Sequence, residues 1–172
     1  MEELIDYQQY PVVAAERATK ARRSLGIGYI GLAHYLARNG VKYEDPKAWK
    51  LVHDLTEAFQ YYLIKASNEL AKEKGWCEDF GRTKYSDGIL PIDTYKKDVD
   101  ELVPNNLKYD WESLRSSILE HGLRHSTLSA QMPSESSSVV SNETNGIEPP
   151  RDYLSIKKSK KGPLKQLSLI HI

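Results

Sequence analysis

The sequence is poor in the residues that build redox and metal centres. It has one cysteine and five histidines in 172 residues, so an internal disulfide is excluded and a zinc site is not favoured. The 24 basic residues balance 24 acidic ones, which leaves no net charge to attract nucleic acid or an anionic membrane. No apolar run approaches the roughly 20 residues of a membrane span. The sequence therefore predicts a cytoplasmic protein of a reducing compartment, without nucleic-acid, membrane or metal partners.

Most of the remaining sequence has the pattern of amphipathic helix. Apolar residues recur every three or four positions between residues 46 and 74, which predicts one long helix with a single buried face. Asp45 suits the N-cap of this helix and Pro46 its first position, while Gly75 supplies the stop. Shorter helices are expected at two other places: residues 12–23 and residues 29–39.

A second capped helix is expected to begin near residue 111. Asp110 occupies its N-cap position, and Gly122 follows its last turn. Four apolar side chains are expected to face inward from it: Trp111, Leu114, Ile118 and Leu119. The pattern also allows a short helix over residues 95–102.

Two segments in the last third of the chain have strand character. Residues 123–132 are expected to form a short buried strand, and residues 153–158 alternate lysines with apolar residues like an exposed strand. Asn145 and Gly146 form a dipeptide typical of hairpin turns. Helices with a few strands predict an α/β architecture. Long amphipathic helices with so little sheet to cover indicate part of a larger domain.

The serine-rich segment between the expected buried strand and a short helix is the candidate binding site. Residues 133–138 read Pro-Ser-Glu-Ser-Ser-Ser. The first N–H groups of a helix have no intrahelical partners and lie at the positive end of the helix dipole, so this arrangement can hold an anion. Backbone N–H groups and hydroxyls would bind it, because the segment has no basic side chain. On composition alone, a capped turn or a flexible linker explains a serine cluster more often.

Two other motifs suggest chemistry that their context does not support. Residues 26–31 spell GxGxxG, but the preceding Lys-Ala-Arg-Arg-Ser is not the apolar strand that a dinucleotide-binding turn requires. These glycines are expected to allow close packing of a turn and a helix. Cys77 stands beside Glu78 and Asp79, and neighbouring carboxylates raise the pKa of a thiol and suppress its reactive thiolate.

Two further groups of residues are expected to be structural. The adjacent Tyr61 and Tyr62 diverge by about 100° around a helix, so one ring should pack and the other should be peripheral. Lys20, Arg22 and Arg23 are expected on a solvated helix face, although such a cluster could also meet a neighbouring domain.

Several motifs, in a fixed order, resemble the large subunit of class I ribonucleotide reductases. They are RRSLGIG at residues 22–28, EAFQYY at 57–62, KASNELA at 65–71, GILPIDTYKK at 88–97, HGLR at 121–124, STLSA at 126–130, MPSESS at 132–137, SN at 141–142 and NGIEPPR at 145–151. The stretch at residues 88–97 is similar to the bacterial and phage class Ia type. The resemblance covers residues 4–166 without a gap.

This resemblance implies a ten-stranded α/β barrel that reduces ribonucleoside diphosphates at the 2′ carbon through a cysteine thiyl radical. In such enzymes the substrate diphosphate lies on a loop that corresponds here to Pro133, Ser134, Glu135, Ser136 and Ser137. This is the segment that its residues already mark as an anion site. Ser136 stands where the family commonly has threonine, and the substitution keeps the hydroxyl.

The resemblance places the remaining machinery outside this chain. The thiyl cysteine and its glutamate, the reducing cysteine pair, the radical-path tyrosines and the effector sites have no counterpart in it, so no catalytic residue and no bound cofactor is expected. The glycines of residues 26–31 fall in a helical region of the family. The parent enzyme would use the diiron-tyrosyl radical of a small subunit, thioredoxin or glutaredoxin as reductant, and ATP and deoxynucleotide effectors. Its large subunits would form a homodimer.

Residues 1–166 are therefore expected to be part of the barrel domain, and residues 167–172 a non-native tail read through from a sequencing adaptor. Alone, the chain should be an inactive fragment, since the chemistry needs a radical-carrying cysteine and a reducing pair. One alternative is a short non-enzymatic module that binds phosphate or acts as a scaffold. A second is a cobalamin-dependent or anaerobic reductase, against which the stretch at residues 88–97 argues.

Overall fold

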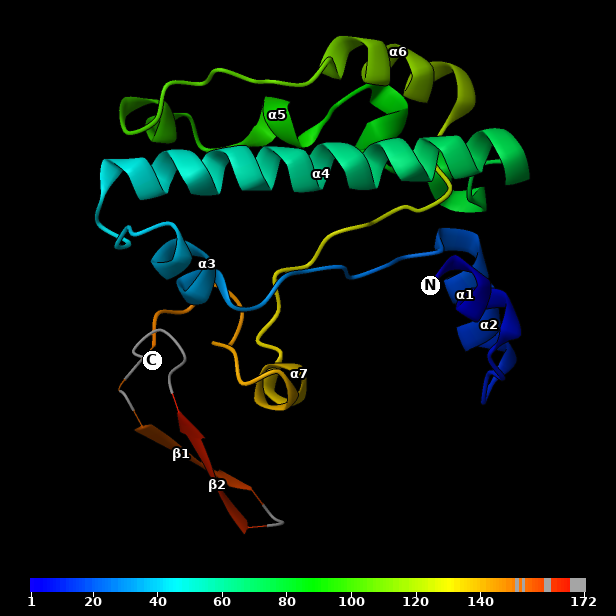
Figure 1. Cartoon of the computed structure of the whole chain (residues 1–172). Coiled ribbons are helices and arrows are strands. Elements are labelled where there is room, and N and C mark those ends of the chain that lie inside the picture. Colours follow the sequence, from blue (N-terminus) through cyan, green and yellow to red (C-terminus); the bar gives the residue numbers. More distant parts are fainter. Residues whose placement is uncertain (151, 153, 160–161, 168–172) are drawn as a thin grey trace. The chain divides into compact units, whose positions relative to one another are not determined.

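The computed structural model describes residues 1–150, 152, 154–159 and 162–167, and most of these residues are helical (Figure 1). The α-helices are α1 (Glu2–Tyr7), α2 (Val13–Arg22), α3 (Leu32–Arg38), α4 (Pro46–Lys74), α5 (Pro91–Thr94), α6 (Trp111–His121) and α7 (Glu135–Val140). The 3-10 helices are η1 (Glu78–Arg82), η2 (Lys84–Asp87) and η3 (Lys97–Glu101), and the strands are β1 (Leu154–Ser159) and β2 (Gly162–Leu167). No helix of the described residues is both long and apolar enough to cross a membrane.

The chain divides into two compact units. The first unit joins residues 1–26 to residues 53–130, and the second joins residues 27–52 to residues 131–172. The expected non-native tail falls almost wholly on residues 168–172, which lie outside the described residues, whereas Leu167 ends β2.

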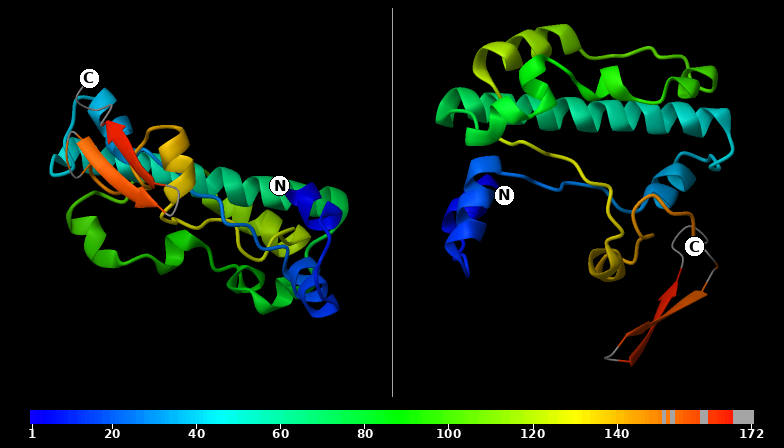
Figure 2. Two further views of the ribbon diagram at one scale, coloured as in Figure 1. Left: turned by 90° about the horizontal axis from the view of Figure 1, so that it is seen from below. Right: turned by 180° about the vertical axis from the view of Figure 1, so that it is seen from behind.

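The core of the first unit lies where α4 meets α6. Ile64 of α4 packs with Trp111, Leu114 and Ile118 of α6, and Leu123 joins them just beyond the end of α6. Figure 2 shows α4 as one unbroken helix in both views. The predicted limits of α4 are confirmed, because it begins at Pro46 and Gly75 follows its last residue.

The cap of α6 is also confirmed, but one of its predicted inward residues is wrong. The Asp110 carboxylate accepts a hydrogen bond from the Ser113 N–H at 3.0 Å, and Gly122 ends the helix. Leu119 is 55 % exposed. It follows the buried Ile118 directly, and a step of one residue turns the side chain about 100° away from the buried face.

Residues 123–132, predicted as a buried strand, form no strand apart from an isolated bridge at Ser129. Four backbone hydrogen bonds fasten the segment within the first unit. Two join it to residues 22–25, and the other two run from Cys77 N–H to the Leu123 carbonyl at 3.0 Å and from Arg124 N–H to the Ser67 carbonyl at 3.1 Å. These bonds go to different parts of the chain and do not make a ladder, since a strand needs a neighbour that pairs with it residue after residue. The prediction identified an extended segment but could not supply the partner.

The second unit contains α3, α7 and an antiparallel hairpin of β1 and β2. The hairpin register pairs Leu154 with Leu167 and Ser159 with Gly162. The predicted exposed strand at residues 153–158 is thus confirmed, shifted by one residue. The chain turns at Gly146, as the Asn145–Gly146 dipeptide suggests, but neither strand adjoins this turn, and the Gly146 carbonyl accepts a bond from Leu32 N–H at 3.3 Å. Within the described residues the fold is mostly helical, with one two-stranded sheet.

Candidate functional site

The serine-rich loop leads into α7 in the second unit. Ser134 is the N-cap residue of α7. The first hydrogen bond of the helix runs from the Ser138 N–H to the Ser134 carbonyl oxygen, with an N···O distance of 2.9 Å. The N–H groups of residues 135–137 precede that bond and are therefore not used in the helical ladder. The side chains of Ser136 and Ser137 are exposed. The loop thus presents backbone donors and hydroxyls together.

Three side-chain oxygens of the second unit are buried without a partner. They are Ser134 Oγ, Thr144 Oγ1 and Asn145 Oδ1, for which the described residues supply no hydrogen bond. A buried polar atom left unpaired costs about 1–3 kcal/mol. Three such atoms within a dozen residues favour an occupant that can exchange hydrogen bonds with them.

The sequence around this loop has no positively charged side chain that could hold an anion. No lysine or arginine lies between residues 127 and 150. Binding would depend on main-chain N–H groups and hydroxyls at the positive end of the α7 dipole. Pro133 is exposed and has no N–H, so its contribution is a fixed φ that directs the chain into the loop. Glu135 contributes the first N–H of α7.

Residues 141–146, here called the return limb, close the loop. The limb is bonded to α7 and to the start of α3 by several backbone hydrogen bonds. They include Glu143 N–H to Ser138 O at 2.8 Å, Gly31 N–H to Thr144 O at 3.1 Å, and Leu32 N–H to Gly146 O at 3.3 Å. The return limb therefore bonds α7 to α3, and α3 supports the serine loop through these bonds.

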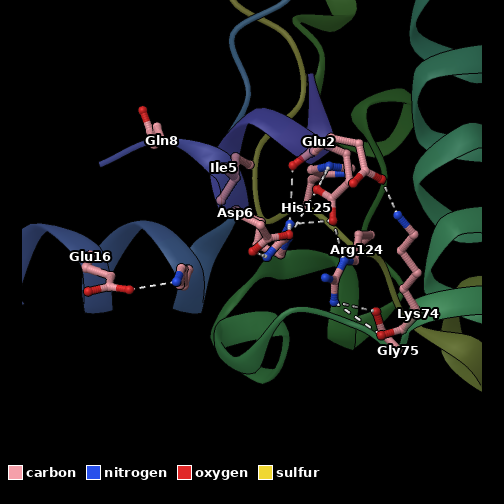
Figure 3. Close-up of polar contacts among 12 residues, drawn as sticks. Glu2, Ile5, Asp6, Gln8, Glu16, Lys74, Gly75, Arg124 and His125 are labelled. Atoms are coloured by element: carbon pink, nitrogen blue, oxygen red, sulfur yellow. Dashed lines mark hydrogen bonds and ion pairs between the residues drawn. The ribbon is translucent and has the colours of Figure 1, made fainter. Parts of the chain in front are cut away.

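A buried ionic cluster in the first unit escaped the sequence analysis. Arg23, expected on a solvated face, is only 4 % exposed, and its guanidinium lies 2.5 Å from Glu2 and 2.6 Å from Asp6. His125 lies beside Glu2, with its Nε2 2.9 Å from Glu2 Oε2 (Figure 3). On its other side, His125 Nδ1 is 2.9 Å from Ser67 Oγ. The available signal was the spacing of Glu2 and Asp6, four residues apart on one face of a helix.

Burial and pairing set the charge states in this cluster. Burial raises the pKa of Glu2, but hydrogen bonds from Arg23 and Arg124 outweigh it and hold that pKa below its usual value. The hydrogen bond from Arg23 also lowers the pKa of Asp6. Burial lowers the pKa of His125, although the neighbouring Glu2 carboxylate opposes this effect. The cluster therefore holds a neutral imidazole among ionised groups at neutral pH.

The glycine motif forms no dinucleotide-binding turn. Residues 24–30 belong to no helix, so the expectation that the glycines fall in a helical region is wrong. Gly31 is the N-cap of α3 with φ at +72°, a left-handed conformation that glycine adopts without strain. A Cβ on Gly26 would lie 3.4 Å from Ala130 Cβ. That distance is an ordinary contact, whereas a Cβ on Gly31 would lie 2.6 Å from Glu143 Oε2, so the expected close packing is confirmed at Gly31.

The cysteine and the tyrosine pair are placed as the sequence predicts. Cys77 is buried, and burial raises the pKa of its thiol more than the Asp79 carboxylate does. The Tyr61 ring stacks on Tyr109 with 4.7 Å between centroids, whereas Tyr62 is 54 % exposed. Burial, which a sequence does not display, is thus the main cause at Cys77.

A cavity of about 460 Å³ lies in the first unit, among η1, η2, α5 and residues 126–127. Its arginines do not offer free charge, since Arg22 and Arg82 both pair with Asp79, at 3.2 Å and 3.3 Å. The described residues contain no group of three or more His, Cys, Asp or Glu side chains arranged to hold a metal ion. The serine loop therefore remains the candidate site.

Comparison with known proteins decides the family. The ribonucleotide reductase barrel domain family matches residues 1–170. This chain belongs to that family. The ribonucleoside-diphosphate reductase alpha subunit of Haemophilus influenzae is 64 % identical over 167 residues, which cover 97 % of this chain and 22 % of that protein.

Other ribonucleotide reductases give the same result. The Escherichia coli reductase 1 alpha subunit is 61 % identical over 163 residues, covering 95 % of this chain and 21 % of that subunit. The alpha subunit of Enterobacteria phage T4 is 51 % identical over 167 residues, covering 97 % of this chain and 22 % of that subunit. The chain thus spans about a fifth of the length of these relatives. The resemblance found in the sequence is confirmed.

Proposed function

We propose that this chain is part of the alpha subunit of a class I ribonucleoside-diphosphate reductase, and that residues 133–137 hold the diphosphate of its substrate. Membership of the barrel family supports the first statement. The observation that supports the second is the geometry of the loop: N–H groups at the start of α7 that precede the helical ladder, two exposed serines, and a Ser134 hydroxyl with no partner among the described residues.

The function of the loop follows from these donors. Three backbone N–H groups and up to three hydroxyls can bond the diphosphate oxygens, with the Oγ of the half-buried Ser134 below the surface and Ser136 and Ser137 exposed. Such donors hold the substrate by one end and so fix the ribose at a set distance from the loop. They also leave the diphosphate's charge partly uncompensated, since the segment has no cation.

The complete enzyme would draw its other parts from elsewhere. We propose that a small subunit supplies a radical from its diiron-tyrosyl centre, that thioredoxin or glutaredoxin supplies electrons, and that ATP and deoxynucleotides act as effectors on a dimer of large subunits. Cys77 would carry none of this chemistry, because a buried, protonated thiol is a poor nucleophile and a poor ligand. The 172-residue chain by itself is expected to show no turnover with a small subunit, and turnover would overturn this part of the proposal.

A chimera tests the role of the loop. The matching segment of the Escherichia coli alpha subunit is replaced by the 163 residues of this chain that align with it, and reduction of ribonucleoside diphosphates is assayed with the small subunit. Replacing Ser134, Ser136 and Ser137 together by alanine should weaken diphosphate binding by about 1–3 kcal/mol, because the backbone donors remain. The KM should rise more than kcat falls.

Ser116→Ala is the matched control. The Ser116 hydroxyl donates to the Glu112 carbonyl of α6 in the first unit, at 3.0 Å, and its side chain is exposed. We expect the KM of this variant to stay near that of the parent chimera. An unchanged KM in the triple serine variant would mean that the hydroxyls contribute nothing, and it would remove the main support for the loop as the diphosphate site.

A further inference from the structure

Glu143 stands at the centre of the contacts that fix the serine loop. Its N–H donates to the Ser138 carbonyl of α7 at 2.8 Å. Its Oε1 lies 2.6 Å from His34 Nδ1 on α3. The two side chains are 21 % and 29 % exposed, so solvent and salt screen the contact less than at an open surface. One residue thus connects α3 to the helix that begins at the loop.

Gly31 provides the space that the Glu143 carboxylate fills. A Cβ on Gly31 would lie 2.6 Å from Glu143 Oε2 and 2.9 Å from its carboxyl carbon, distances at which one of the two groups has to move. The N–H of Gly31 also donates to the Thr144 carbonyl at 3.1 Å. The absent side chain at position 31 and the carboxylate at position 143 are therefore complementary in shape.

The return limb also carries two polar side chains next to Glu143. Thr144 and Asn145 follow Glu143 directly, and their buried side-chain oxygens have no partner within the described residues, as is true of Ser134. A displacement of Glu143 would therefore move two further polar groups as well as α7. Both displacements would change which atoms face an occupant of the loop.

We propose that Glu143 is a positioning residue for the diphosphate loop, held by His34 and by the space at Gly31. The inference rests on the proposed function, since it assigns a support to that same site. In this inference α3 stays in place. Glu143 contacts His34 of α3 through its carboxylate and bonds to the Ser138 carbonyl of α7 through its N–H, and it thereby fixes the N–H groups of residues 135–137. A displacement of about 1 Å in a group that positions substrate can cost on the order of 100-fold in rate.

Two glycine substitutions distinguish the effect of the contact with Glu143 from the effect of strain in a left-handed backbone. Gly31→Ala and Gly40→Ala both place alanine at a left-handed φ, +72° and +68°. At Gly40 no atom lies within 4 Å of the added Cβ, whereas at Gly31 it meets Glu143. In the chimera, Gly31→Ala should raise the KM for ribonucleoside diphosphate by roughly 10- to 100-fold, and Gly40→Ala should leave it within about twofold.

Substitutions of Glu143 test the same contact from the other side. Glu143→Ala should raise the KM about as much as Gly31→Ala, and Glu143→Gln should recover much of the loss, because an amide oxygen can still accept a bond from His34. The double variant Gly31→Ala/Glu143→Ala should be no worse than Glu143→Ala alone, since the collision is gone. Hydrogen exchange at residues 135–140 should quicken with Gly31→Ala and not with Gly40→Ala.

The outcomes distinguish this inference from the proposed function. If the triple serine variant raises KM while Gly31→Ala and Glu143→Ala behave like Gly40→Ala, Glu143 does not position the loop and only this inference fails. If the serine variant also leaves KM unchanged, the hydroxyls contribute nothing and the proposed function loses its main support as well. Equal acceleration of exchange in both glycine variants would assign the effect to strain at the left-handed backbone and would likewise overturn the role of Glu143.

Discussion

In the first unit the buried groups of Glu2, Arg23 and His125 bond to one another and to Ser67, whereas in the second unit the buried oxygens of Ser134, Thr144 and Asn145 have no partner among the described residues. Polar groups that satisfy each other stabilise a fold. Groups left open cost stability and are kept where a bound molecule completes them. The contrast is not absolute, because Glu57 Oε2 in the first unit is also unpartnered, although Glu57 Oε1 accepts three N–H bonds.

The largest expected loss of stability in the buried network of the first unit comes from substitution of Arg23. Arg23→Ala leaves the buried Glu2 carboxylate without its main cation, and we expect the free energy of unfolding to fall by about 3–5 kcal/mol. Pulse proteolysis of the 172-residue chain in urea, at low protein concentration, measures this. The neighbouring Arg22→Ala is the control: Arg22 is 63 % exposed and pairs with Asp79, so its loss should cost about 1 kcal/mol or less. Equal losses would contradict a buried network.

A pair of serine substitutions compares the two units directly. Ser67→Ala removes a buried hydroxyl that bonds to His125 Nδ1 and accepts from the His125 N–H, so it should cost about 1–3 kcal/mol. Ser134→Ala removes a buried hydroxyl oxygen that has no partner among the described residues, so it should not lower the free energy of unfolding and should raise it by up to about 1–3 kcal/mol. The same urea measurement serves both variants. A large loss at Ser134 would show that its hydroxyl already has a structural role.

Acid should weaken the first unit through His125. Because burial lowers the folded-state pKa of His125, the unfolded chain binds the proton more readily below about pH 6.5. The stability that neutral imidazole provides is therefore complete above that pH and is lost as the pH falls towards the folded-state value. His125→Gln should flatten the dependence of unfolding free energy on pH between about 7 and 5. A slope unchanged by this substitution would assign the effect to other groups.

The parts of the fold that sequence predicts are those fixed by local chemistry. Pro46 and Gly75 bound α4 as expected, and Asp110 caps α6 through its own side chain, because each depends on residues within one turn. Residues 123–132 were misassigned because a strand depends on a partner elsewhere in the chain. Leu119 was misplaced because its apolar character does not say which side of a helix it occupies.

The sequence predicts the hydrogen-bond donors of the candidate site but not the contacts that hold them in place. Ser134, Ser136 and Ser137 are adjacent in the sequence, and the start of a helix is enough to mark them as donors. The pairing of His34 with Glu143 joins residues 109 positions apart, and Arg23 reaches back 21 positions to Glu2. Contacts of that span are set by the folded backbone, which no local pattern describes.

The burial of Cys77 makes the rate of its alkylation a measure of how often the first unit opens. Cys77 is 1 % exposed and burial raises the pKa of its thiol, so an alkylating reagent can reach a thiolate only when the first unit opens. With no second thiol in the sequence, the rate of labelling would report that opening alone, without an engineered probe. The same shielding keeps this sulfur out of disulfide exchange with thiol reductants in solution.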